Sequence, residues 1–207
     1  MEITKLEHSG IAIVKAGETL VCDPVEFNTK VPILNNVVAI VITHKHSDHY
    51  QAEVVARILQ NNPSARIFTT ADAAIEGATV VKAGDSVTVG GFKLDFFGKD
   101  HAAIIPGQIP CQNIGVVVDD QIVNPGDSFD LPEVRPKVLF TPIAGPWSKV
   151  SESIDFVDKA MPDLVIPFHD AVLSDLGKSF NNAWVGRACG DVGAELVVLE
   201  PGQKIEI

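Results

Sequence analysis

The stretch Val37–Tyr50, VVAIVITHKHSDHY, determines how the rest of the chain is interpreted. The apolar run VVAIVI is typical of a buried strand, and the pattern H-x-H-x-D-H follows it directly. The chain contains six histidines, and three of them lie in this motif with one aspartate: His44, His46, Asp48 and His49. Imidazole and carboxylate groups placed together after a strand predict a metal site.

Size and composition limit the classes of protein to consider. A chain of 207 residues with 46% hydrophobic residues suits one domain, residues 1–207, and is compatible with a homo-oligomer. The net charge of −11 leaves no basic surface for nucleic acid or an anionic membrane. We find no apolar run near the ~18 residues of a membrane span and no signal-peptide plan at the N-terminus. We therefore expect a cytoplasmic protein with a small-molecule partner.

The three cysteines are far apart in sequence and form no C-x-x-C pair: Cys22, Cys111 and Cys189. An odd number of such residues indicates reduced thiols rather than disulfides. We expect each to be a small core residue rather than a reactive one.

Short apolar runs separated by turn residues predict a chain rich in strands. The expected strands are Ile3–Leu6, Ile11–Lys15, Thr19–Cys22, Val37–Ile42, Ala65–Thr69, Thr79–Val81, Ser86–Val89, Phe92–Phe97, a hairpin turning at Asp119–Asp120, Lys137–Phe140, Leu164–Pro167, Glu195–Leu199 and Lys204–Ile207. Helical periodicity predicts a helix that starts at Ser47 within the motif, a short one after Thr70, one at Ser151–Ala160 and one within Ala171–Ala188. This order favours an α/β (α+β) fold with two sheets face to face and helices outside.

Single residues at later strand ends are the candidates to complete the metal site. Each zinc or iron ion needs three or more nitrogen or oxygen ligands, so the motif alone cannot fill two sites. His101, Asp127 and His169 each follow an expected strand. Ligands at several strand ends would meet at one edge of a sheet.

The ordered set resembles the metallo-β-lactamase-fold metal-dependent hydrolase superfamily. That family has a strand-end Asp, H-x-H-x-D-H, a His, an Asp and a His, and this chain has VCDP (Asp23), THKHSDH, His101, Asp127 and His169 in that order. The resemblance implies a four-layer αβ/βα sandwich with two metals at one edge. It places His44, His46 and His101 on the first metal, Asp48, His49 and His169 on the second, and Asp127 between them.

The same resemblance makes Asp23 a residue that orients ligands, with a plain Asx-Pro turn as the alternative. The opening LEHSGIAIVKAGETLVCDP and the late PIAGPWSK and PFHD segments resemble the L-ascorbate-6-phosphate lactonase-like branch, although Glu7 stands where Gly is frequent. For His8 we prefer a surface or hairpin histidine over a residue at the site rim. Trp147 and Lys149 are candidates for substrate contact, with packing and surface roles as the preferred alternatives. We expect Lys45 to point away from the metals.

The implied activity is that of a dimetal hydrolase. Two divalent ions, zinc by preference with manganese or iron(II) as alternatives, would hold a hydroxide that attacks a small-molecule ester, lactone or phosphodiester. Asp48 and Asp127 would act as the catalytic carboxylates that orient the hydroxide and exchange its proton. The chain contains no G-x-S-x-G nucleophile motif.

Several relatives of the same fold fit less well. A dizinc β-lactamase would have Cys at position 127, and a flavodiiron protein would have Glu at position 46. Nucleic-acid-processing relatives have basic surfaces and added domains. Two alternatives stay open: a glyoxalase-II-like thioesterase, and a metal-binding sensor or interaction protein of the same fold without turnover.

Overall fold

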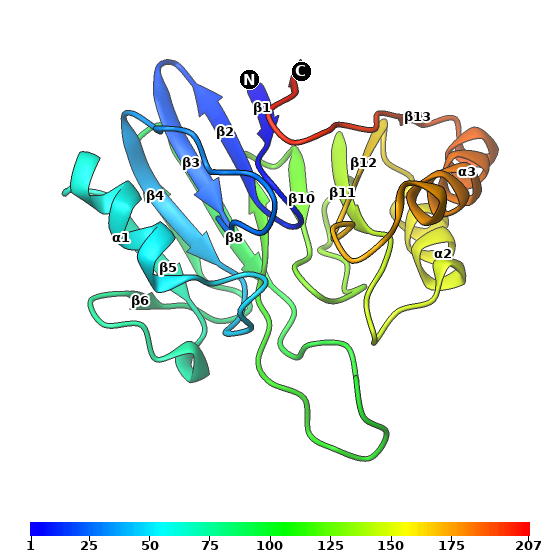
Figure 1. The fold of residues 1–207 in the computed structure, drawn as a ribbon, viewed down its shortest axis with the longest axis horizontal. Helices are drawn as coiled ribbons and strands as arrows, with labels where there is room; N and C mark the ends of the chain where they lie inside the picture. The colour runs from blue at the N-terminus through cyan, green and yellow to red at the C-terminus, as the bar shows by residue number, and fades with distance from the viewer.

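Two mixed sheets of seven strands each form the centre of the molecule (Figure 1). The computed structural model describes the whole chain, residues 1–207. The first sheet has the spatial order β14 (Lys204–Glu206), β1 (Glu2–Lys5), β2 (Ile11–Lys15), β3 (Glu18–Cys22), β4 (Val37–Ile42), β5 (Arg66–Thr69) and β6 (Thr79–Val80). The second has the order β13 (Glu195–Leu196), β12 (Leu164–Phe168), β11 (Val138–Pro142), β10 (Ile122–Asn124), β9 (Gly115–Val118), β8 (Phe92–Phe97) and β7 (Ser86–Val89).

Helices cover the outer face of each sheet. Helix α1 (Ala52–Asn61) packs on the first sheet, and α2 (Val150–Ala160) and α3 (Asp175–Val192) pack on the second (Figure 1). The only other helical segment is the short 3₁₀ turn η1 (Ala71–Ala73). The layers therefore run helix, sheet, sheet, helix, which confirms the predicted four-layer sandwich.

The space between the sheets is the main core, with 22 buried hydrophobic residues. Strand β8 shows how the sequence builds it: Phe92, Leu94 and Phe96 are buried and alternate with more exposed residues, as expected of a strand with one inward face. Strand β4 is buried along nearly its whole length because the core lies on one side and α1 on the other. This explains why its sequence is a continuous apolar run.

Parallel pairing brings several strand ends to one edge. In the first sheet β3 is parallel to β4 and β4 to β5. In the second sheet β10 is parallel to β11 and β11 to β12. The loops that follow these strands therefore leave the sheets on the same side, and they contain the candidate ligands other than His101, which follows β8.

Two helix boundaries differ from the sequence prediction. The helix after the motif begins at Ala52 rather than Ser47, because residues 46–50 form a turn in which the N–H groups of His49 and Tyr50 both donate to His46 O. Helix α3 extends to Val192 instead of Ala188 and ends at Gly193, whose φ of 75° favours glycine. The strand after α3 is shorter than predicted, Glu195–Leu196.

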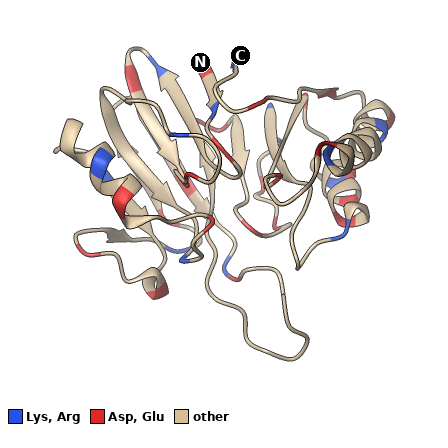
Figure 2. Ribbon diagram, in the orientation of Figure 1, with Lys and Arg blue, Asp and Glu red and all other residues tan.

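Charged side chains are scattered over both sheets and all three long helices, and acidic and basic residues are interspersed (Figure 2). None of the helices combines the length and the apolar composition needed to cross a membrane. All three cysteines are free thiols.

Candidate metal centre

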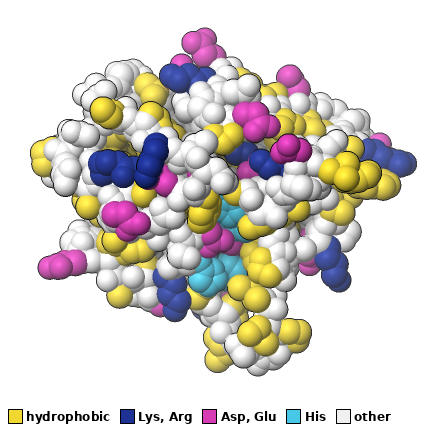
Figure 3. All heavy atoms as spheres, viewed as in Figure 1, with side chains coloured by type: hydrophobic (Ala, Val, Ile, Leu, Met, Phe, Trp, Pro, Cys, Tyr) yellow, Lys and Arg dark blue, Asp and Glu magenta, His cyan; other side chains and the backbone are white.

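All predicted ligands meet at the edge where the parallel strands end. His44 follows β4, His101 follows β8, Asp127 follows β10 and His169 follows β12. In the space-filling view the histidine side chains are visible at the bottom of a central hollow, next to acidic side chains (Figure 3). Each of these residues was predicted from the sequence, and the structure brings all of them together.

The first cluster consists of His44, His46, His101 and Asp127, whose potential ligand atoms lie within 4.8 Å of one another. His44 Nε2 is 3.1 Å from His46 Nδ1. His101 Nε2 lies 3.1 Å and His44 Nε2 3.8 Å from Asp127 Oδ2. His46 is the one partly exposed member, so the cluster is open to solvent on its side.

The second cluster consists of His8, Asp48, His49 and His169, again with potential ligand atoms within 4.8 Å. Asp48 Oδ2 lies 3.5 Å from His169 Nε2 and 3.6 Å from His8 Nε2. His8 is 1% exposed, so the expectation of a surface histidine was wrong, although the residue does lie in the hairpin turn between β1 and β2. The turn directs its ring inward, and no local pattern in the sequence indicates this.

Asp127 connects the two clusters. Its Oδ1 lies 3.0 Å from His49 Nε2, and its Oδ2 lies 3.1 Å from both His101 Nε2 and His169 Nε2. The residue is 1% exposed, and no lysine or arginine pairs with it. A carboxylate in this position can serve both clusters at once.

Several buried polar atoms in the centre have no hydrogen-bond partner, and they test whether the residues fit metal ions. They include Asp127 Oδ1, His8 Nε2 and both ring nitrogens of His169. Asp127 Oδ1 and His49 Nε2 are close, yet their geometry is not that of a hydrogen bond. Buried polar atoms without a partner cost free energy. A cation placed between these atoms would interact with their lone pairs and remove that cost. The donor set of imidazoles and carboxylates fits divalent ions.

The electrostatics of the first cluster favour neutral imidazoles. Burial lowers the pKa of His44 well below its usual value, and the positive charge on His49 adds to this effect. Burial and the neighbouring His101 likewise lower the pKa of His46. Neutral imidazole is the form that binds a metal.

The second cluster has the opposite tendency. Burial opposes the charged form of His49, but the carboxylates of Asp127 and Asp23 outweigh it and raise its pKa well above the usual value. The pKa of His169 rises to about 9 because Asp127 and Asp48 outweigh burial in the same way. Burial would raise the pKa of Asp127, yet the charges on His49 and His169 hold it well below its usual range.

Hydrogen bonds behind the clusters fix the orientation of the rings. His49 Nδ1 donates to Asp23 Oδ2 at 2.8 Å, which leaves Nε2 directed at Asp127. The Thr43 hydroxyl donates to the same carboxylate at 2.7 Å, and the Thr43 N–H donates to Asp23 Oδ1. Asp23 is fully buried and makes these contacts to the site, so its role exceeds that of a plain turn.

The backbone of the centre is strained at residues that contribute to it. His8, Asp23 and His169 have φ values of 54°, 45° and 58°, in the left-handed region that non-glycine residues rarely adopt. Such conformations cost about 1–3 kcal/mol each and gather at functional sites. Gly126 is required for space, since a Cβ there would lie 2.3 Å from Asn113 Oδ1.

Two contacts that position ligands escaped sequence reasoning. The buried Asn113 accepts the N–H of Asp127 on its Oδ1 at 3.0 Å and thus fixes the loop after β10. Lys5 Nζ donates to Asp170 Oδ2 at 2.7 Å, and the Lys5 side chain is only 2% exposed. This ion pair ties β1 to the residue next to His169. No motif marks either contact, although a lysine in an apolar strand is a weak signal.

Four other predicted residues take clear positions. Trp147 is buried, with its ring 5.5 Å from those of His101 and His169, so it packs beneath the site. Lys149 is exposed at the start of α2. Lys45 pairs with Asp72 at 3.1 Å, outside both clusters, as expected. Cys111 is not a core residue: it is half-buried, with Sγ 3.5 Å from His46 Nε2.

Comparison with known proteins places this centre in a family. Residues 2–169 match the family model described as a Beta-lactamase superfamily domain. The chain belongs to this superfamily, and it is a metal-dependent hydrolase of the metallo-β-lactamase fold.

Individual relatives agree with this assignment. Protein Rv0786c of Mycobacterium tuberculosis is 30% identical over 84% of this chain and 86% of its own length. UPF0173 metal-dependent hydrolase MJ1163 of Methanocaldococcus jannaschii is 23% identical over 84% of this chain and 85% of its own. The structure of Igni18, a metallo hydrolase of Ignicoccus hospitalis, superposes with a TM-score of 0.74 at 19% identity and covers 99% of this chain and 97% of that one.

Proposed function

We propose that the chain, acting as one domain, is a two-metal hydrolase of a small-molecule ester, lactone or phosphodiester. The observation that carries the proposal is the buried Asp127 carboxylate, which turns one oxygen to His49 and the other to His101 and His169 and has no lysine or arginine partner. The two oxygens face histidines of different clusters, so this carboxylate could contribute to two neighbouring ion sites.

The first ion would be held by His44, His46 and His101, the second by Asp48, His49 and His169, and both by Asp127. We propose zinc, with manganese or iron(II) as alternatives, because mixed nitrogen and oxygen ligands suit all three. Two bound ions would supply a nucleophile from water at neutral pH and polarise the oxygen of the bond to be cleaved.

The chain itself orients the reacting groups. The Asp48 side chain is 35% exposed while His49 is buried, so Asp48 is the carboxylate that a bound substrate and water can reach. In this proposal it accepts a proton from the attacking water and returns it to the leaving group. Asp127 holds the geometry, and Asp23 keeps His49 in the tautomer that presents Nε2.

Metal analysis of protein purified without an affinity tag tests the proposal. We expect about two ions per chain in the wild type and fewer than one in Asp127→Ala. A screen of esters, lactones, thioesters and phosphodiesters should then reveal hydrolysis that His46→Ala abolishes. Two ions without any hydrolysis would favour the sensor or interaction protein, and a preference for thioesters would favour the glyoxalase-II-like alternative.

The lactonase-like branch and a cytoplasmic location stay predictions. Free thiols at all three cysteines support a reducing compartment.

A further inference from the structure

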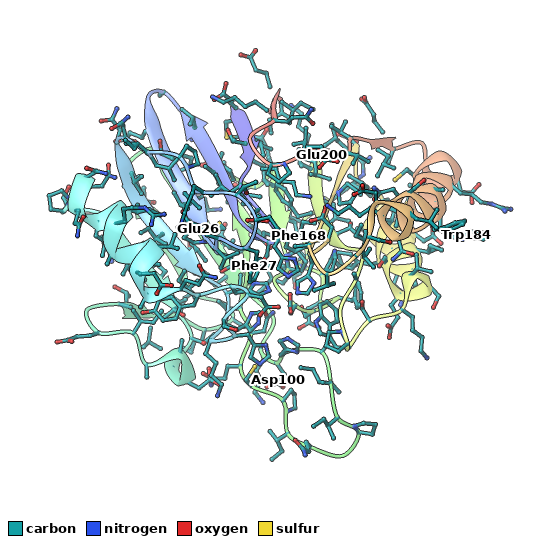
Figure 4. The ribbon with its side chains drawn as sticks, in the orientation of Figure 1. Glu26, Phe27, Asp100, Phe168, Trp184 and Glu200 are labelled. Atoms are coloured by element: carbon teal, nitrogen blue, oxygen red, sulfur yellow. The ribbon has the colours of Figure 1, made fainter.

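A long loop between β8 and β9, which leaves the body of the molecule beside Asp100 in Figure 4, carries an unusual set of side chains beside the first cluster. We call residues 102–111 the apolar loop; they contain no Lys, Arg, Asp or Glu. The loop projects from the body of the molecule and is uncharged beyond its base in Figure 2. Its base is fixed, because His101 N–H donates to Cys111 O and Ala102 N–H donates to Asp127 O. Long loops of this kind are commonly functional.

The apolar loop encloses a cavity that opens onto the metal centre. The cavity has a volume of about 180 Å³, and its walls are His46, His101, and residues of the loop, among them Ile104, Ile105 and Ile109. These isoleucines are 43%, 51% and 95% exposed, and Figure 3 shows hydrophobic side chains gathered on the projecting tip. Exposed apolar surface next to a reactive site marks a binding surface.

We infer that this cavity binds an apolar, uncharged substituent of the substrate, such as a short acyl or alkyl chain, while the scissile group lies over the two clusters. The inference rests on the proposed hydrolase function. His46 and His101 belong both to the first cluster and to the cavity wall. An acyl or alkyl chain in the cavity would therefore place the adjoining scissile group at the proposed ion sites. No lysine or arginine lines the cavity, so a phosphate or carboxylate there would lose water without gaining a lysine or arginine partner.

The volume of the cavity limits the length of the acyl or alkyl chain that it can hold. At about 30 Å³ per water-sized group, 180 Å³ holds roughly six such groups. Each methylene that leaves water contributes up to about 0.8 kcal/mol, or roughly fourfold in kcat/KM. Because one side of the cavity is open to solvent, we expect a smaller gain, of about two- to threefold in kcat/KM for each methylene from acetate to hexanoate. Acyl chains longer than hexanoate should bring no further gain in kcat/KM.

p-Nitrophenyl esters from acetate to octanoate test the inference on the zinc-loaded enzyme. The hexanoate-to-acetate ratio of kcat/KM should be about 20 in the wild type and fall several-fold in Ile104→Ser and Ile105→Ser. Ile33→Ser is the matched control, since Ile33 is 77% exposed and does not line this cavity. A flat dependence on chain length in an active enzyme would overturn the inference, whereas hydrolysis of none of the esters, lactones or phosphodiesters would count against the proposed function itself.

A binding measurement tests the cavity independently of any hydrolytic activity. 1-Hexanol added to metal-free protein should shift the backbone amide resonances of the apolar loop and leave those of α3 unchanged. Shifts spread evenly over the molecule would contradict a defined cavity.

A second inference concerns His8 and rests on a different observation. The N–H of Ala171 donates to His8 Nδ1 at 3.1 Å, so the lone pair of that nitrogen is in use. His8 Nε2 is buried, has no partner and lies 3.6 Å from Asp48 Oδ2. A neutral imidazole has one N–H and one lone pair. With the lone pair on Nδ1, the hydrogen must be on Nε2.

We propose that His8 is a hydrogen-bond donor to Asp48 and not a fourth ligand of the second cluster. Ligation through Nε2 would move the hydrogen to Nδ1, where it would face the N–H of Ala171 with no acceptor between them. The donor role makes His8 a positioning residue: its Nε2–H is directed at Asp48 Oδ2, the oxygen that also faces His169 Nε2, and fixes the orientation of that carboxylate. A shift of about 0.5 Å would bring the two atoms into hydrogen-bond range.

Long-range ¹H–¹⁵N spectra of the zinc-loaded protein give the tautomer directly. We expect the hydrogen of His8 on Nε2, and zinc-induced shifts at the five proposed histidine ligands of the two clusters but not at His8. His8→Gln, which can supply an N–H, should keep two zinc ions and retain more kcat than His8→Ala. A hydrogen on Nδ1, or the loss of one zinc equivalent in His8→Gln, would overturn the proposal.

Discussion

The two clusters of the metal centre have similar ligands and similar burial, yet they differ in how the chain builds and charges them. The first cluster takes two histidines from one short motif, and its environment lowers the pKa of His44 and His46. The second joins the two ends of the matched region, because His169 N–H donates to His8 O across 161 residues of chain. Its carboxylates raise the pKa of His49 and His169.

This difference indicates how the sites would be filled. In the first cluster the lowered pKa of His44 and His46 favours neutral rings, so an ion binds these two residues without displacing protons. In the second cluster His49 and His169 have a raised pKa and favour the protonated form at neutral pH, so an ion that binds them must displace protons. The motif supplies two residues to each cluster, and the cluster that also depends on the contact between His8 and His169 is the one whose ion must displace protons.

Asp127→Asn removes the one residue that the clusters share, and it should have the largest effect. Changing an outer partner of a ligand costs about 10- to 100-fold, and we expect the loss of kcat/KM and of bound metal to exceed this at both clusters. Metal analysis and ester hydrolysis provide the measurement, with the exposed Asp163→Asn as control. Loss of only one ion would separate the clusters and argue against a shared carboxylate.

Asp170→Asn should affect the second cluster selectively. It leaves the buried Lys5 ammonium without its carboxylate, which costs about 3–5 kcal/mol of unfolding free energy. Because Asp170 follows His169, zinc affinity should fall about 10- to 100-fold at the second cluster and hold at the first. Urea unfolding and stepwise zinc titration measure the two effects, and Glu2→Gln, which breaks the exposed pair with Lys204, is the control. Equal weakening of both clusters would contradict the distinction.

Metal-free protein should lose stability as the pH rises from 6.5 to 9. The folded pKa of His169 is about 9, against 6.5 as the ordinary value, so its stabilising proton is fully present below pH 6.5 and is lost as pH rises through 9. The expected loss is about 2–3 kcal/mol. Urea unfolding of chelator-treated protein at the two pH values measures it. Zinc-loaded protein should show no such decline, since its ligands are already deprotonated. The same change of unfolding free energy with pH in both forms would contradict the assignment of this proton to His169.

Lys45→Ala should have the smallest effect, although Lys45 stands between two ligands in sequence. Its ammonium pairs with Asp72 away from the ions, and a partly exposed pair of this kind contributes about 0–1 kcal/mol. We expect zinc content to stay at the wild-type value and kcat/KM to change by less than about twofold. A tenfold loss would show that Lys45 contacts the substrate.

The sequence predicted the layers well, and it predicted that His101, Asp127 and His169 would gather beside the motif, because apolar runs mark the strands that these residues follow. Their role as ligands stays a prediction. Strands such as Ile11–Lys15 and Phe92–Phe97 have the predicted bounds, since apolar runs and turn residues mark them. The start of α1 was predicted too early, because hydrogen bonds to His46 O hold the motif in a turn that periodicity does not reveal. The assignment of each ligand to a particular ion stays a prediction.

The residues that were misjudged or missed share one property: their partners are distant in sequence. His8 faces Asp48, Lys5 pairs with Asp170, and Cys111 approaches His46. Each contact forms only when the sheets pack, so no local pattern encodes it.

The sequence by itself determined the chemistry of the centre, because imidazoles and carboxylates after apolar runs fix which atoms reach the edge of the sheets. Tertiary structure alone decided which nitrogen each ring presents and which residues complete the second cluster. It also decided where the apolar loop lies relative to the first cluster. Those properties depend on distances between segments, and distances arise only from packing.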